Sequence, residues 1–68
     1  MSYLLKHKRS GFYVSYKDNK FDLVSEMHKA TIFSCVHDIV VLVDYNSLRK
    51  TEYYILEIHT KRIKAPWD

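Results

Sequence analysis

The 68-residue sequence is poor in the residues that shape many small secreted proteins, with one cysteine, one glycine and one proline. A chain with Cys35 alone cannot close an internal disulfide, whereas secreted domains of this size usually carry several. The longest apolar run, residues 39–43, is far shorter than the roughly 20 residues of a membrane span, and residues 1–9 lack the apolar stretch of a signal peptide. We therefore expect a cytoplasmic protein without a membrane-embedded segment.

The composition is that of a globular protein, with 47% hydrophobic and 28% charged residues. This content of apolar residues supports folding and is unlike that of disordered chains. The length allows one small core and leaves few residues for a large catalytic cleft. We expect a single domain over residues 1–64, followed by a tail at residues 65–68, where Pro66 disfavours a central strand.

Alternating apolar and polar residues predict a hairpin at the start of the chain. Residues 3–8 and 12–17 both alternate, and Gly11 between them can adopt the positive φ that a short turn requires. Residues 18–20 have turn chemistry, and residues 21–24 resume an extended pattern. The first third of the chain is thus predicted to form three antiparallel strands.

The middle of the chain predicts a helix over residues 35–46, with Ser34 as its N-cap. An apolar stripe at helical spacing supports this assignment, and it consists of Val36, Ile39, Val40 and Val43. A buried strand is the alternative, because residues 39–43 are all apolar and mostly β-branched. The length of the segment favours the helix.

A strong strand pattern covers residues 52–60. One face carries Tyr54, Leu56 and Ile58, and the other carries Tyr53, Ile55, Glu57 and His59. Residues 61–64 are expected to continue as an exposed basic segment. The predicted fold is α+β, a small antiparallel sheet with one packed helix in the order βββαβ. The predicted core consists of Val14, Ile39, Val40, Val43, Leu56 and Ile58.

Several segments together resemble small accessory proteins of tailed bacteriophages. The residues that carry the resemblance are the hairpin strand at 12–16, the segment 30–34 before the helix and the strand at 52–58, in a chain biased toward Tyr, Lys, Asn and Ile. The resemblance concerns size, composition and layout. It implies a host-takeover or anti-defence protein that acts by occupying a surface of a host enzyme or defence complex.

Residues with catalytic or metal-binding chemistry are scattered. The histidines at positions 7, 28, 37 and 59 and the cysteine at 35 do not show the spacing of a zinc site, so we expect no metal and no cofactor. Cys35 beside His37 lacks an identifiable orienting group or oxyanion donor, and we expect Cys35 to be a small buried residue. The acids Asp38, Asp44, Glu52 and Glu57 show no pairing that tunes an acid and a base. These patterns predict a protein that is not an enzyme.

Positive charge concentrates at both ends of the chain, around an acidic middle. Aromatic rings and cations on one sheet face can stack bases and hold phosphates. A small nucleic-acid-binding protein, of RNA or DNA, is therefore one hypothesis. Its candidate residues are Lys6, Lys8, Arg9, Lys17, Lys61, Arg62 and Lys64, which would join if the last strand lay beside the first hairpin.

The second and favoured hypothesis is a protein-binding inhibitor or adaptor. Six tyrosines in 68 residues exceed the average, and tyrosine is enriched at the energetic centres of protein interfaces. The candidate partner-binding residues are Tyr13, Tyr16, Tyr53, Val41 and Leu42. Self-association into a homo-oligomer would use the same surface.

Overall fold

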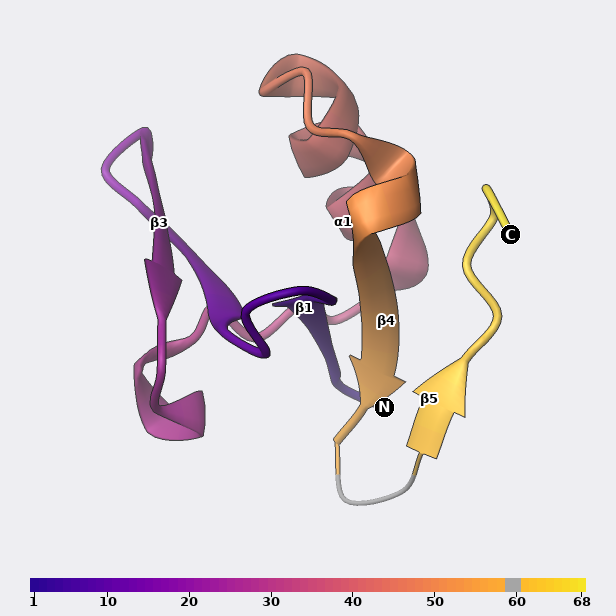
Figure 1. Cartoon of the computed structure of the whole chain (residues 1–68), viewed down its shortest axis with the longest axis horizontal. Helices are drawn as coiled ribbons and strands as arrows, with labels where there is room; N and C mark the ends of the chain where they lie inside the picture. The colour runs from indigo at the N-terminus through magenta and orange to yellow at the C-terminus, as the bar shows by residue number, and fades with distance from the viewer. Residues whose placement is uncertain (59–60) are drawn as a thin grey trace.

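The computed structural model describes residues 1–58 and 61–68, which form one five-stranded antiparallel sheet and one α-helix. The elements are β1 (Tyr3–His7), β2 (Tyr13–Lys17), β3 (Lys20–Val24), the 3-10 turn η1 (Met27–Lys29), α1 (Val36–Tyr45), the 3-10 turn η2 (Lys50–Glu52), β4 (Tyr53–Glu57) and β5 (Lys61–Ile63). The strand order is β3-β2-β1-β4-β5, with the β2–β3 hairpin on one side of β1 and β4 with β5 on the other (Figure 1). The predicted α+β fold is confirmed.

The turns of the predicted strands follow their sequence chemistry. Gly11, in the connection between β1 and β2, has a φ of 72°. Asp18 and Asn19 join β2 to β3 with φ values of 51° and 62°. These two residue types tolerate the left-handed region that a tight hairpin turn needs.

β1 and β2 pair over only part of their length, where Lys6 lies opposite Tyr13. Beyond that pair, residues 31–33 enter between the two strands and take over their backbone hydrogen bonds. The Tyr3 N–H donates to the Phe33 carbonyl at 2.8 Å, and the Phe33 N–H donates back at 2.9 Å. Thr31 donates its N–H to the Val14 carbonyl at 3.1 Å. We call residues 31–33 the wedge; it leads directly toward α1.

The helix prediction over residues 35–46 is confirmed by α1, which buries Ile39, Leu42 and Val43. The predicted Ser34 cap is wrong, because Cys35 occupies the N-cap position and forms no side-chain cap hydrogen bond. In the part of the chain that the structure describes, no helix is long and apolar enough to cross a membrane.

The two faces of β4 are the reverse of the prediction. Ile55 lies opposite Leu5 of β1, and both are fully buried in the cluster that packs on α1. Leu56 and Ile58, expected in this core, are only half-buried, and Val40 is half-buried as well. Both faces of β4 carry large apolar side chains, so alternation alone does not say which face meets the helix.

The opposite face of the sheet is covered at one end by the segment around η1. Leu4 of β1 points to this face and is fully buried. It lines a hollow together with Met27, His28, Ile32 and Ile58. The central strand β1 is therefore buried on both faces, by α1 on one side and partly by η1 on the other.

The C-terminal residues form a fifth strand and a cap on the core. Within β5, Ile63 lies opposite Ile55 and Arg62 lies opposite Leu56. Ala65 is buried and Trp67 packs against the core cluster. The Ala65 N–H donates to Oδ2 of Asp68 at 2.7 Å. Residues 65–68, expected as a tail, thus fold back onto the domain, and positions 59–60 of the predicted strand lie outside the described residues.

The reversed faces of β4 predict unequal costs for truncating its two neighbouring apolar residues. Ile55→Ala removes a fully buried side chain and should lower the free energy of unfolding by about 2–5 kcal/mol, whereas Leu56→Ala, at a half-buried site, should cost less. Urea denaturation of both variants measures the difference. A larger loss for Leu56→Ala would contradict the orientation of β4.

Candidate functional site

An apolar groove lies between α1 and the end of the β2–β3 hairpin. Its volume is about 350 Å³. Tyr16 of β2 and Phe33 of the wedge contribute from the sheet side, and four helix residues and two turn residues complete the lining. These are Asp38, Val41, Leu42, Tyr45, Asn19 and Asn46.

The groove combines a buried apolar floor with exposed apolar walls. Phe33 and Leu42 are each 7% exposed, which makes them part of the core. Val41 is 51% exposed and Tyr45 is 78% exposed, both on α1. Large side chains that leave apolar surface in water beside a concave apolar floor are typical of a site that binds another molecule.

A hydroxyl of the wedge holds Tyr16 in place at the groove. The Tyr16 N–H donates to Oγ1 of Thr31 at 2.6 Å, and this hydroxyl lies 3.2 Å from the Tyr16 carbonyl, to which it donates. Leu48 N–H donates to the Val43 carbonyl at 3.0 Å, and Asn46 donates through Nδ2 to the Leu42 carbonyl at 2.9 Å. These bonds end α1 directly beside the groove.

Only some of the residues expected to bind a protein partner lie in the groove. Tyr16, Val41 and Leu42 line the groove, although Leu42 does so as a buried floor residue. Tyr13 lies on the opposite face of the sheet, since it is paired with Lys6. The sequence reasoning missed Tyr45, whose signal is its position four residues after Val41, on the same side of the helix.

Tyr53 is a core residue, so the expectation that it is a surface anchor is wrong. Its side chain is 6% exposed and faces α1. Burial raises the pKa of Tyr53 above its ordinary value of 10.0, and the negative charge of the neighbouring Glu52 raises it further. The neutral phenol is therefore the form that the folded protein favours.

On the sheet face opposite α1, tyrosines and cations alternate across four strands. The Lys6 Nζ lies 4.9 Å from the centre of the Tyr13 ring. The Arg62 guanidinium carbon lies 4.7 Å from the centre of the Tyr54 ring. Lys6 also lies opposite Tyr54 in the β1–β4 register. The four side chains form a row that we call the sheet row, in the order Tyr13, Lys6, Tyr54, Arg62.

The other predicted basic residues are spread around the molecule. The predicted last strand, β4, does lie beside β1 of the first hairpin. Residues 61–63, expected as its basic continuation, instead form β5 on the other side of β4 and so lie apart from the hairpin. Lys8 and Arg9 lie in the β1–β2 turn beside a separate pocket, and Lys61 lies opposite Glu57 on the helix side. Lys17 lies opposite Lys20 on the same face as the sheet row, and Lys64 follows the end of β5.

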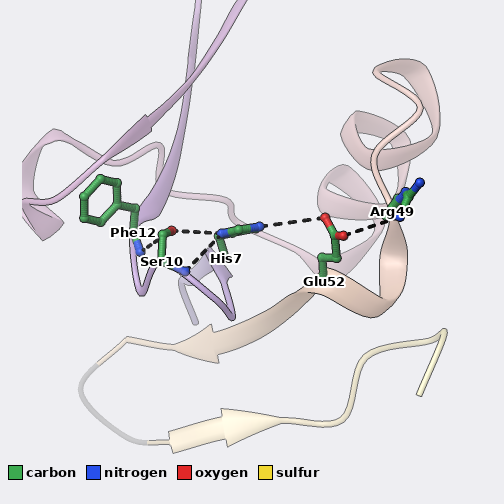
Figure 2. Close-up of polar contacts among 5 residues, drawn as sticks. All are labelled: His7, Ser10, Phe12, Arg49 and Glu52. Carbon is green, nitrogen blue, oxygen red and sulfur yellow. Dashed lines mark hydrogen bonds and ion pairs between the residues drawn. The ribbon is translucent and has the colours of Figure 1, made fainter.

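His7 links the β1–β2 turn to the start of β4, as Figure 2 shows. Its Nδ1 lies 2.9 Å from Oγ of Ser10 and accepts the Ser10 N–H at 3.3 Å. Its Nε2 lies 3.8 Å from Oε1 of Glu52, whose other oxygen lies 3.8 Å from Arg49.

A serine, a histidine and a carboxylate are also the groups of a hydrolase triad, but here their contacts stabilise the β1–β2 turn. Oγ of Ser10 accepts the Phe12 N–H at 3.1 Å, which ties this oxygen to the hairpin backbone. The separation between His7 and Glu52 is longer than a hydrogen bond, so the carboxylate does not fix the imidazole as a triad requires. These contacts stabilise the β1–β2 turn and connect it through Glu52 to the start of β4.

Within residues 1–58 and 61–68, no three His, Cys, Asp or Glu side chains group to hold a metal ion, and His59 lies outside this range. Cys35 is exposed, so its expected burial is wrong: the N-cap position places it at the surface.

This chain matches no protein-family model, no curated protein and no solved structure. The groove and the sheet row are the two candidate binding surfaces from which a function can be proposed.

The raised pKa of Tyr53 predicts an alkaline loss of stability. Since the folded-state pKa exceeds the unfolded-state value, the stabilisation is complete below pH 10.0 and is lost as the pH rises through the folded-state pKa. Tyr53→Phe has no phenol to ionise and should lose less stability across this range than the parent. Urea denaturation at pH values from neutral to strongly alkaline measures this, with Tyr54→Phe, on the other face, as the control. Equal alkaline losses for Tyr53→Phe and the parent would contradict the account.

Proposed function

We propose that this chain is a non-enzymatic protein-binding inhibitor or adaptor that attaches to its partner through the groove beside α1. The observation that supports this most is the exposure of Val41 and Tyr45 next to a buried apolar floor. Tyrosine offers a large apolar ring and a polar tip, a combination enriched among residues that dominate binding energy at protein interfaces. A partner side chain inserted over Phe33 and Leu42 would remove the exposed walls from water.

The charge around the groove indicates the kind of segment that fits. Asp38 lines the groove, and no salt bridge to Asp38 is found within the described residues. Asp44, on the same helix, lies 3.1 Å from Lys50 and is already compensated. A partner segment that places an apolar side chain beside a lysine or arginine would fill the groove and pair with Asp38.

The partner class follows from the resemblance to bacteriophage accessory proteins. Proteins of that kind commonly act by occupying a surface of a host enzyme or defence complex, which requires binding and no chemistry of their own. We propose the same mode of action for this chain, in the cytoplasm. The exposed, unpaired Cys35 is compatible with the reducing conditions of that compartment.

The groove can be tested by capturing the partner on the immobilised chain from a nuclease-treated extract of its native cell. Tyr45→Ala should weaken the captured partner's binding by about 30-fold or more, because truncating a central interface aromatic costs about 2 kcal/mol or more. Ile32→Ala is the matched control, since Ile32 is 63% exposed and lines the hollow on the opposite face. Biolayer interferometry with the purified partner gives the affinities.

Three outcomes would contradict this function. Equal affinities for Tyr45→Ala and the parent would exclude the groove as the interface. Loss of the partner on nuclease treatment would assign the interaction to nucleic acid. A dimer of the purified chain that Tyr45→Ala dissolves, seen by sedimentation equilibrium, would show that a second copy occupies the groove.

A further inference from the structure

We infer that the sheet row is a binding site for single-stranded nucleic acid, with Tyr13 and Tyr54 as stacking platforms and Lys6 and Arg62 as phosphate contacts. The site lies on the sheet face opposite α1 and shares no residue with the groove. It is therefore independent of the proposed protein-binding function, and the two can fail separately.

The spacing of the two rings suits an extended strand of nucleotides. Tyr13 belongs to β2 and Tyr54 to β4, with β1 between them, and both lie in register with Lys6. Neighbouring strands lie about 4.8 Å apart, so the two rings are roughly 10 Å apart on one face. This distance leaves room for a base on each ring, with Lys6 between the two stacks.

The charge of this face complements a phosphate backbone. In the described strands, the face carries the cations Lys6, Lys17, Lys20 and Arg62 and a single carboxylate, Asp22. The helix acids Asp38 and Asp44 belong to α1, on the other side of the sheet. A polyanion is thus attracted to the sheet row and repelled from the helix side.

The two cations that lie over the rings do not block stacking. Arg62 is exposed and Lys6 is half-buried, so their contacts with the rings are made by the ends of long, flexible side chains. A base stacked on an aromatic ring is held more strongly than an exposed cation over the same ring. A bound strand would therefore exchange a cation for a base on each ring, and each displaced cation would reach a phosphate.

The site favours single strands over duplexes because only unpaired bases present their faces. At the far end of this sheet face, the segment around η1 covers Leu4, which limits the open area to the row and the β2–β3 strands. A short, shallow surface of this kind holds a few splayed nucleotides but cannot read the groove of a double helix.

The inference can be tested by fluorescence anisotropy with a labelled oligouridylate of about 12 nucleotides, and with an RNA duplex of the same length as comparator. Replacing both Tyr13 and Tyr54 by Leu should weaken binding about 30-fold or more through the loss of two stacks. The double Phe variant should bind like the parent, because stacking needs the ring and not the hydroxyl. Leu preserves apolar cover of the sheet, and circular dichroism confirms the fold of each variant.

The charge contribution is tested separately. If Lys17 and Lys20, on the same face, also contact phosphates, the four cations predict a slope of about −2.8 for the logarithm of affinity against that of salt concentration. Lys6→Gln with Arg62→Gln should reduce the slope to about −1.4. Lys8→Gln with Arg9→Gln removes the same charge from the β1–β2 turn and should leave the slope near the parental value.

Four results would overturn the inference: equal losses in the two charge variants, unchanged affinity in the double Leu variant, tighter binding to the duplex, or no binding at low salt. Equal losses in the two charge variants would show that binding comes from the general attraction of a basic protein for a polyanion and not from the sheet row. A fifth result would overturn it as well: a loss in the double Phe variant equal to that in the double Leu variant would show that the hydroxyls bind by hydrogen bonding and that stacking is not the main contribution.

Discussion

The hydrogen bonds of the wedge, residues 31–33, are the constraint on which the arrangement of this molecule depends. β2 leaves β1 after a single residue pair, and a split of this kind would leave backbone groups of both strands without partners. The wedge supplies those partners through Phe33 to Tyr3 and through Thr31 to Val14. The wedge thereby fills the gap between the two strands, and the chain continues from it into α1 on the opposite side of the sheet from η1.

Both candidate sites follow from this split. At its open end, the β2–β3 hairpin diverges and Tyr16 stands apart from α1, so that the wedge residue Phe33 becomes the floor of a groove. At its closed end, β1 and β2 remain paired, and Lys6 is brought between Tyr13 and Tyr54. Lys6 and Arg62 lie on this open sheet face, whereas Asp38 and Asp44 belong to α1 on the other side of the sheet.

The sequence is sufficient to predict β1 to β4, the helix and the α+β class, because each of these depends on a local pattern, whereas residues 61–63, expected as an exposed continuation, form the separate strand β5. It is insufficient where both alternatives are apolar: Ile55 and Leu56 are equally suited to a core, and only pairing with Leu5 selects Ile55. For the sites, the sequence names Tyr13, Lys6 and Arg62 as candidates, but it misses Tyr54, because the neighbour relations that complete the sheet row depend on the order of the strands in the sheet. Long-range pairing of this kind leaves no local signature in the chain.

Amide hydrogen exchange by NMR tests the central role of the wedge most directly. If the wedge is an integral part of the sheet, the Tyr3 and Phe33 amides, which donate to each other's carbonyls, should exchange as slowly as the β1–β4 ladder, through global unfolding. Exchange of these two amides at the rate of a surface loop, while the ladder stays protected, would show that the wedge opens independently of the sheet and would contradict the account.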